Sequence, residues 1–273
     1  MHYVQLNQGN KIPQLGLGVY QTADGQQTMD AVCWALEAGY RHIDTAKIYG
    51  NEKSVGDAIR ESKIPRQQIF LTTKLWNDDI RAGRTEEAFN ESLAALQTDY
   101  IDLYLLHWIG HYPFSETVRA LAELQQEGKI RQWGMSNLDV ADMEHILSLP
   151  HGKECAADQV LYNLRDRGIE YDLIPWCGRH GIPVMAYTPL GEGRLRNHKT
   201  LVEIARRHDA TPTQIMLAWE MRTQNVIAIP KASSIAHVEE NARSLAIILT
   251  EEDLRDIDKA FPAPTRKIAL AGW

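Results

Sequence analysis

The sequence predicts an α/β protein folded as a (β/α)8 TIM barrel. Short runs rich in β-forming residues alternate with longer segments of helical period, and the alternation yields eight β-then-α units. No linker, repeat or low-complexity tract interrupts these units over 273 residues. A length of about 250 residues is typical of one such barrel, so we expect residues 1–273 to form a single domain.

Eight β-rich runs are the expected barrel strands. They cover residues 15–19, 41–44, 69–74, 101–107, 130–136, 155–159, 182–187 and 226–230. Two more short runs, 3–6 and 11–13, flank a Gln8-Gly9-Asn10 turn. This pattern predicts an N-terminal β-hairpin that closes the bottom of the barrel.

Segments of helical period separate the strands, and they cover residues 26–38, 51–62, 85–98, 114–127, 139–148, 170–180, 200–208, 212–223 and 235–245. Gly39, Gly128 and Gly181 follow three of them, and we expect each glycine to end its helix in the left-handed conformation. Thr211 begins a capping box with proline at the first helical position. Thr250 opens a C-terminal helix in a similar way.

A doubly wound parallel sheet is the rival arrangement. Its dinucleotide-binding form needs a GxGxxG turn after the first strand, and Gly16-Leu17-Gly18-Val19-Tyr20-Gln21 lacks the third glycine. No phosphate-cradling glycine loop follows any other early strand. The barrel is therefore favoured.

Composition and charge argue against several classes of protein. Apolar residues make up 44% of the chain, and 29 Lys and Arg stand against 36 Asp and Glu, a net charge of 29 − 36 = −7. This acidic balance disfavours a general binder of nucleic acid or of acidic membranes. The three cysteines form no CxxC pair, and no signal peptide or membrane-spanning run is visible. We expect a cytoplasmic protein, a monomer or weak homo-oligomer, with no nucleic-acid or membrane partner.

Polar side chains follow most of the predicted strands, at the end where such a barrel carries its chemistry. Asp44, Lys74 and His107 each follow an apolar run, and buried ionisable groups need partners. Any single polar residue at a strand end is explained equally well by solvent exposure and by a functional role, but the whole set favours a functional site. We expect Asp44 to pair with Lys74, beside Tyr49 in the next loop. Because an ammonium favours a phenolate, this set predicts a proton-transfer site, with neutral His107 orienting a carbonyl oxygen.

Other chemistries fit less well. His107 and His111 lie four residues apart without the glutamate of HExxH, so no metal site is expected. No GxSxG turn is present, which disfavours a serine hydrolase. The loop that begins at Gly191 is compatible both with a phosphate cradle and with a structural turn.

At these positions the chain resembles the aldo-keto reductases. Residues 44–52 are similar to the family signature DTA-x-x-Y-x-NE, residues 72–76 to its TTK-LW strand end, and residues 103–108 to its LxLxHW segment. The resemblance extends from Gly16 to the terminal helix. It implies a catalytic tetrad. Tyr49 is the general acid, Lys74 and Asp44 tune its acidity, and His107 orients the substrate carbonyl.

The resemblance also implies a site for NADPH. Ser136, Asn137 and Gln159 match residues that hold the nicotinamide carboxamide. Tyr187 matches the aromatic residue that stacks on the nicotinamide ring, and Lys231 matches the residue that binds the 2′-phosphate. The full set implied is Gly18, Ser136, Asn137, Gln159, Tyr187, Pro189, Leu190, Gly191, Lys231, Ser233, His237, Glu240 and Asn241. The sequence departs from the family pattern at Ala232, where serine is usual, and at His237, where arginine is frequent. Use of NADH is therefore harder to exclude than it would be for a chain that matches the pattern in full.

Residues 159–163, 168–177 and 229–238 look most like bacterial methylglyoxal or 2,5-diketo-D-gluconate reductases. The segment after Gly193 is short and the chain ends soon after Lys267, which predicts an open substrate pocket walled by Tyr20, Trp76 and Trp108. The expected activity is NADPH-dependent reduction of aldehydes and ketones to alcohols (EC 1.1.1.-), with small dicarbonyls or diketo sugar acids as substrates. The alternative is an NADPH-binding barrel acting as a redox-sensing or partner subunit, although an intact tetrad favours catalysis.

Overall fold

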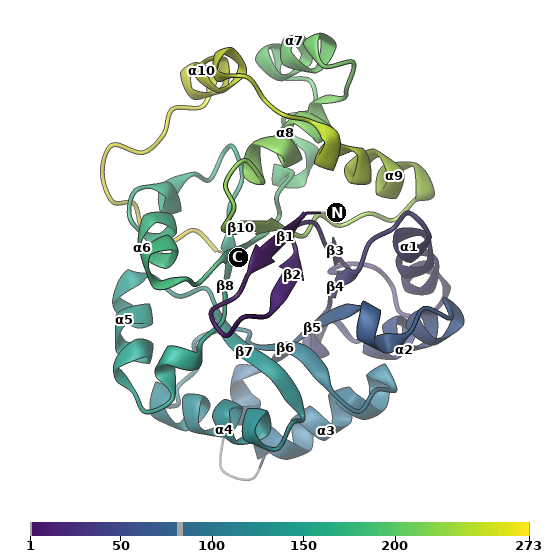
Figure 1. Ribbon diagram of the computed structural model, residues 1–273, viewed down its shortest axis with the longest axis vertical. Helices are drawn as coiled ribbons and strands as arrows, with labels where there is room; N and C mark the ends of the chain where they lie inside the picture. The colour runs from purple at the N-terminus through teal and green to yellow at the C-terminus, as the bar shows by residue number, and fades with distance from the viewer. Residues whose placement is uncertain (1, 81–83, 273) are drawn as a thin grey trace.

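The computed structural model describes residues 2–80 and 84–272, and its centre is a parallel sheet of eight strands in chain order, β3 to β10. Isolated bridges join Leu15 to Ala228 and Gly18 to Lys231, linking the first strand to the last. The sheet therefore closes on itself, which confirms the predicted barrel (Figure 1).

The strands lie close to their predicted positions. Their bounds are β3 (Leu17–Gly18), β4 (His42–Asp44), β5 (Phe70–Leu75), β6 (Ile101–Leu106), β7 (Ile130–Ser136), β8 (Asp158–Leu161), β9 (Val184–Tyr187) and β10 (Val226–Ala228). The largest difference is β8, which begins and ends later than the predicted 155–159. Cys155, Ala156 and Ala157 are as fully buried as the strand itself, so the apolar pattern did not mark where pairing with β7 and β9 begins.

Ten helices follow or separate the strands and surround the barrel in Figure 1. Within the described residues they are α1 (Gln26–Glu37), α2 (Glu52–Glu61), α3 (Arg84–Leu96), α4 (Phe114–Gln126), α5 (Val140–Ser148), α6 (Leu173–His180), α7 (Lys199–Arg207), α8 (Pro212–Glu220), α9 (Ile235–Arg243) and α10 (Glu251–Ala260). The capping boxes at Thr211 and Thr250 are both present. Gly39, Gly128 and Gly181 have φ of 94°, 73° and 67°, the predicted left-handed conformation.

The bottom of the barrel is closed by the N-terminal hairpin of β1 (Tyr3–Gln5) and β2 (Lys11–Pro13), as predicted. Val4, Leu6 and Ile12 are buried and form one apolar cluster with side chains of the barrel strands, among them Leu103, Leu105, Met185 and Ile227. Figure 1 shows the hairpin in front of the strands. Since this end is filled, the opposite end, where the strands finish, is left for chemistry.

A second and larger apolar cluster lies between the sheet and the helices. Strand residues such as Ile43 and Val184 pack there with helix residues such as Ala31, Leu121 and Leu173. This layer holds the strands in fixed positions, so side chains at their ends are placed by a rigid scaffold. Every helix in the described ranges is too short or too polar to span a lipid bilayer.

Candidate active site

The end of β4 and the end of β5 bring Asp44 and Lys74 into direct contact. The Lys74 Nζ lies 2.6 Å from Asp44 Oδ1 and 2.8 Å from the Thr45 carbonyl oxygen. The same Nζ lies 3.4 Å from the hydroxyl of Tyr49, which ends a short 3-10 turn (η1, Lys47–Tyr49) after β4. The structure thus brings these three predicted residues together around one buried ammonium.

The loop that carries Tyr49 is fixed by Asn51, a fully buried side chain. Its Nδ2 donates to the carbonyl oxygens of Val19 and Thr22 at 2.9 and 3.2 Å, and its Oδ1 accepts from the Thr45 hydroxyl at 2.9 Å. These bonds tie the loop after β4 to the loop after β3. Sequence reasoning quoted Asn51 only within a motif and did not identify this positioning contact.

Burial and charge act against each other in this group. Burial favours a neutral amine at Lys74, but the charge of Asp44, with Tyr49, outweighs it and raises the pKa of Lys74 above its ordinary value. Burial also raises the pKa of Tyr49, and Lys74 opposes this only in part. The expectation that the ammonium brings the phenol pKa below its ordinary value is therefore wrong for this structure, because desolvation of the phenolate is the larger effect. Tyr49 is a protonated phenol at neutral pH.

His107 follows β6 and faces Tyr49 with its ring. The ring centroids of His107 and Tyr49 lie 5.6 Å apart at an interplanar angle of 77°, and the Trp76 ring lies 5.4 Å from His107. Burial, together with the charge of Lys74, lowers the pKa of His107 to about 3. The imidazole is therefore neutral at physiological pH, and its buried Nδ1 has no hydrogen-bond partner among the described residues.

A cavity of about 840 Å³ lies at this end of the barrel. Most of the predicted site residues line it, namely Gly18, Tyr20, Asp44, Tyr49, Trp76, His107, Trp108, Ser136, Asn137, Gln159, Tyr187, Pro189, Leu190 and Lys231. The predicted residues outside its lining are Lys74, Gly191, Ser233, His237, Glu240 and Asn241. Lys74 lies behind the wall, fully buried, in contact with Asp44 and Tyr49.

Next to the tetrad, the ends of β7 and β8 present the amide and hydroxyl groups expected to hold a cofactor. Gln159 Nε2 donates to Asp44 Oδ2 at 2.8 Å. Asn137 is engaged with the protein, since its Nδ2 donates to the His107 carbonyl oxygen at 3.2 Å and its Oδ1 accepts from the Tyr187 hydroxyl at 3.0 Å. The Ser136 Oγ is buried and has no hydrogen-bond partner among the described residues. A buried hydroxyl without a partner fits a site that a polar ligand completes.

Several cavity residues were not predicted individually as site residues, although some lie in segments that the sequence analysis singled out. They are Gln21, Thr22, Ile48, Thr188, Glu192, Gly193, Ile229 and Pro230. Thr188 adopts φ of 54°, which is strained for a β-branched residue, and the Asn163 Nδ2 donates to its carbonyl oxygen at 3.1 Å. The residue type gives no signal for this conformation, and the place of Thr188 directly after a strand indicates only that it lies at the end of the barrel where such a fold carries its chemistry.

The segment after β10 carries the residues expected at the far end of the cofactor. The Lys231 Nζ lies 3.5 Å from Ser233 Oγ, and Ser234 caps α9 by accepting from the His237 backbone N–H. Lys231 lines the cavity, and its side chain is exposed. Lys231 is thus the cationic side chain among the described residues that line this cavity.

The C-terminal segment reaches the rim of the same cavity. Lys267 pairs with Asp139 at 2.9 Å and with Asp172 at 3.0 Å. Farther on, a Cβ placed on Gly272 would lie 3.1 Å from Trp108 and 3.8 Å from the Tyr187 hydroxyl. The expected open pocket is therefore bounded by the chain on the Trp108 side.

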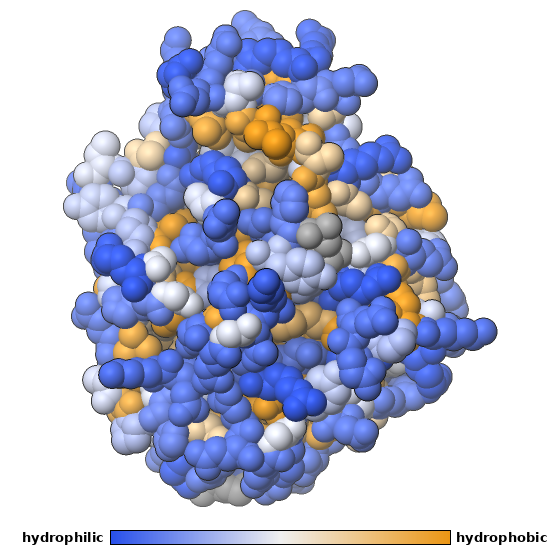
Figure 2. All heavy atoms as spheres, viewed as in Figure 1, coloured by the Kyte–Doolittle hydropathy of each residue, from blue (hydrophilic) through white to orange (hydrophobic). Residues whose placement is uncertain are grey.

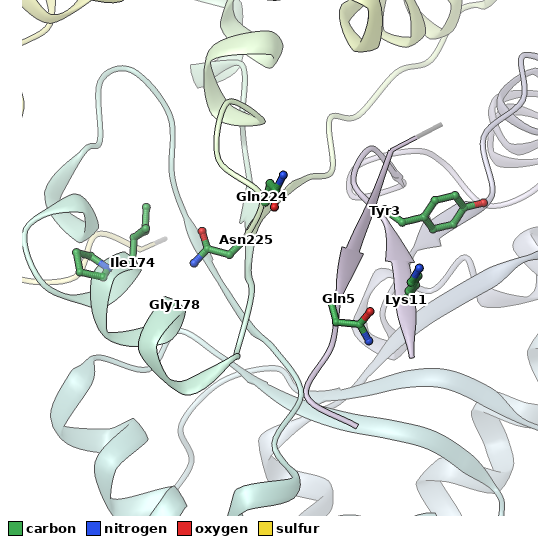
Figure 3. A pocket seen from close by; sticks show the side chains of 8 residues that line it. Tyr3, Gln5, Lys11, Ile174, Gly178, Gln224 and Asn225 are labelled. Carbon is green, nitrogen blue, oxygen red and sulfur yellow. The ribbon is translucent and has the colours of Figure 1, made fainter. Parts of the chain in front are cut away.

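A second cavity, of about 630 Å³, lies between the hairpin, α6 and the turn before β10 (Figure 3). Tyr3, Gln5, Lys11, Ile174, Pro175, Gly178, Gln224 and Asn225 line it. Figure 2 shows this face of the molecule as mostly hydrophilic, with apolar side chains gathered near α8. None of the predicted site residues lines this cavity, whose titratable side chains among the described residues are Tyr3 and Lys11.

Comparison with known proteins identifies the family of this chain. The model of the aldo/keto reductase family matches residues 14–261. The chain belongs to the aldo/keto reductase family. An aldo-keto reductase is an oxidoreductase, and the matched region contains every residue of the tetrad.

Relatives of this aldo-keto reductase cover nearly the whole chain. It is 44% identical over 279 residues to methylglyoxal reductase YeaE of Escherichia coli, covering 98% of this chain and 97% of that protein. It is 38% identical to a glyoxal reductase of Bacillus subtilis, covering 93% and 91%. A crystal structure of an aldo-keto reductase from Klebsiella pneumoniae in complex with NADPH matches with a TM-score of 0.94 and 42% identity, covering 100% of this chain and 99% of that one.

Proposed function

We propose that this aldo-keto reductase reduces aldehydes and ketones to alcohols with NADPH, and that Tyr49 donates the proton. The observation that carries the proposal is the Tyr49 hydroxyl on the cavity wall, 3.4 Å from the ammonium of Lys74, which is itself held by Asp44 at 2.6 Å. A buried phenol beside a fixed ammonium can release a proton and have the resulting charge stabilised.

The reaction adds a hydride to the carbonyl carbon and a proton to the carbonyl oxygen. NADPH supplies the hydride when it is bound. Tyr49 supplies the proton from its hydroxyl, and the phenolate that remains lies beside the Lys74 ammonium. His107 is neutral, since its pKa is about 3, so it can donate a hydrogen bond to the carbonyl oxygen and hold it near Tyr49.

The groups on the other wall fit the cofactor. The unpartnered Ser136 Oγ and the Gln159 amide suit a carboxamide, which both donates and accepts hydrogen bonds. Tyr187 lines the cavity beside them and offers an aromatic face to the nicotinamide ring. The Lys231 ammonium is placed to meet the 2′-phosphate that distinguishes NADPH from NADH.

The proposed substrates are small dicarbonyls such as methylglyoxal. Tyr20, Trp76 and Trp108 line the cavity with aromatic surface, and Gly272 lies against Trp108. An electron-poor carbonyl accepts hydride readily and needs little binding energy from remote contacts. The names of the Escherichia coli and Bacillus subtilis relatives, methylglyoxal reductase and glyoxal reductase, support this class.

The test compares the wild type with Tyr49→Phe in NADPH consumption assays on methylglyoxal, a diketo sugar acid, an aromatic aldehyde and a steroid ketone. The wild type should show its highest kcat/KM on methylglyoxal. Tyr49→Phe should lower kcat by about 10²–10⁴-fold, the usual contribution of a general acid, while the Kd for NADPH stays within about twofold. A Tyr49→Phe enzyme that keeps most of its kcat would refute the acid assignment. NADPH binding without turnover in the wild type would instead favour a sensing or partner subunit.

A further inference from the structure

A salt bridge joins the turn that carries Tyr49 to the turn that follows Trp76. Lys47 begins η1, the turn that Tyr49 ends. Asp79 lies in η3 (Asn77–Ile80), and its backbone N–H donates to the Trp76 carbonyl oxygen at 3.0 Å. The Lys47 Nζ lies 2.9 Å from Asp79 Oδ2. One ion pair therefore connects the loop after β4 with the loop after β5.

Further bonds hold each member of this pair in place. The Lys47 Nζ also lies 2.7 Å from Glu91 Oε2 on α3. Asp79 Oδ1 accepts from Arg84 Nε at 3.0 Å, and the Asp79 carbonyl oxygen accepts from the Thr85 hydroxyl at 3.0 Å. The side chains of Lys47 and Asp79 are only 22% and 14% exposed. An isolated pair on a surface contributes little, whereas a network of partly buried charges can hold a fixed geometry.

Both side chains of the pair are charged at neutral pH. Burial disfavours the charge on Lys47, but the bonds to Asp79 and Glu91 outweigh it and raise the pKa of Lys47 above its ordinary value. Burial likewise disfavours the charge on Asp79, but the bonds from Lys47 and Arg84 lower the pKa of that carboxyl. Opposite charges therefore attract the two turns to each other at any pH near neutrality.

The same two turns also meet at His107, on the cavity side. The imidazole packs in T-shaped contacts against Tyr49 and Trp76, with ring centroids 5.6 and 5.4 Å away. These three rings line the large cavity, whereas Lys47 and Asp79 lie outside its lining. The ion pair therefore holds the two turns together without entering the space that a substrate occupies.

We propose that the Lys47–Asp79 pair positions two aromatic walls of the cavity relative to each other and thereby favours small carbonyl substrates. The two walls are Tyr49 and Trp76. Without the ion pair the two turns move more independently, so a small substrate is held less well beside the Tyr49 hydroxyl, whereas a larger one fills the added space. This inference rests on the proposed function and assigns part of its specificity to residues outside the cavity.

The test compares the wild type with Lys47→Met in NADPH-dependent reduction of methylglyoxal and of an aromatic aldehyde. Methionine is flexible and similar in length to lysine, but it carries no charge. We expect kcat/KM for methylglyoxal to fall about 3- to 30-fold, within the roughly 100-fold that a misplacement of about 1 Å can cost. The same constant for the aromatic aldehyde should fall at most about twofold, so the ratio of the two constants decreases.

Three more variants test whether the pair acts as a unit. Asp79→Asn keeps the shape of the side chain and should lower the ratio in the same direction, so it also serves if Lys47→Met does not fold. The double variant should lose no more than the larger of the two single losses, because both changes break one contact. Lys47→Arg should retain the wild-type ratio, since a guanidinium can bond carboxylates as an ammonium does. Multiplied losses in the double variant would overturn the inference.

Lys129 provides a matched control. Its Nζ also contacts two carboxylates, at 2.7 Å from Glu86 Oε1 and 2.7 Å from Glu127 Oε2, and its side chain is 28% exposed. It directly precedes β7, at the end of the barrel away from the cavity. Lys129→Met should therefore keep the ratio within about twofold of the wild type. An equal decrease in Lys129→Met, or a uniform loss with both aldehydes in Lys47→Met, would mean a general structural effect and would overturn the inference.

Hydrogen exchange followed by mass spectrometry gives a readout that does not need turnover. The Tyr49 and Asp79 backbone N–H groups close the two turns by donating to the carbonyl oxygens of Ala46 and Trp76, at 2.9 and 3.0 Å. In Lys47→Met the amides of both turns should exchange at least about threefold faster than in the wild type, and in Lys129→Met they should not.

The two readouts separate this inference from the proposed function. If the wild type reduces no carbonyl but Lys47→Met shows the faster exchange, the proposed function fails, and the specificity inferred here fails with it, while the connection between the two turns stands. If the wild type reduces methylglyoxal but Lys47→Met leaves both the ratio and the exchange unchanged, only the role of the Lys47–Asp79 pair fails.

Discussion

Replacing Lys74 with methionine tests whether the buried ammonium holds the site together. Lys74 is fully buried and bonds Asp44 at 2.6 Å and the Thr45 carbonyl oxygen at 2.8 Å. Methionine fills a similar volume, so the change removes the charge with little loss of packing. Asp44 then keeps only its bond from Gln159 at 2.8 Å, and its charge is buried without a cation.

The expected loss of stability follows from that unpaired charge. Removing one partner of a buried ion pair costs about 3–5 kcal/mol. For a chain of this size each kcal/mol lowers Tm by about 2–4 °C, so Lys74→Met should lower Tm by roughly 6–20 °C. The variant Asp44→Leu/Lys74→Met removes both charges and should regain most of the loss, because a buried pair is often worth no more than an apolar pair.

The loss should also depend on pH. Burial raises the pKa of Asp44, and Lys74 is the main group that opposes this. In Lys74→Met the folded state therefore binds a proton at Asp44 more readily than the unfolded chain does, so its free energy of unfolding falls as pH rises above the ordinary carboxyl pKa of about 3.9. The difference from the wild type should be larger at about pH 8 than at about pH 5.

Thermal unfolding followed by circular dichroism, at one scan rate and at both pH values, measures these differences. Turnover should fall as well, because the phenol loses its cation. A Tm change under about 2 °C, which corresponds to less than about 1 kcal/mol, would refute the reasoning. A double variant no more stable than Lys74→Met would refute it equally.

Three further predictions concern groups outside the tetrad. Lys231→Ala should raise KM for NADPH about 10- to 100-fold, as expected for loss of a charge-assisted contact, and should change KM for NADH little; equal losses would assign Lys231 a structural role. Lys267→Met removes the ion pairs that hold the C-terminal segment to Asp139 and Asp172. KM for methylglyoxal should then rise about 2- to 10-fold, while the Kd for NADPH stays unchanged. An unaltered KM at low salt would contradict the view that these ion pairs hold the segment at the cavity. Burial lowers the pKa of His42 to about 3, so the free energy of unfolding should fall by up to about 1.4 kcal/mol per pH unit below about pH 6.5, and His42→Asn should flatten that slope in urea titrations.

The fold was predictable because its signals are local and repeat along the chain. Short β-rich runs alternate with segments of helical period along the whole chain, and the caps at Thr211 and Thr250 follow from side chains three residues apart. Before β8 the pattern of residue types does not show where the strand begins. The start of β8 is decided by its pairing with β7 and β9. The bounds of β8 therefore needed the structure.

The site was predictable for a related reason. In a parallel barrel all strands end on one face, so polar residues at strand ends meet however far apart they are in sequence. Asp44 and Lys74 follow directly from this rule. The contact of Asn51 with Val19 and Thr22, and the backbone conformation of Thr188, depend on how loops fold over that face. Residue type and spacing carry no comparable signal for loops.

The acidity of Tyr49 shows most clearly what sequence reasoning lacks. Residue types give the sign of a pairwise effect, since an ammonium beside a phenol lowers its pKa. They do not give the depth of burial, which here raises the pKa of Tyr49 by more than Lys74 lowers it. A phenol that keeps its proton at neutral pH is in the correct state to act as an acid in reduction. In the reaction proposed above, the Lys74 charge matters most once the proton has left, because it then stabilises a phenolate in a site where solvent cannot.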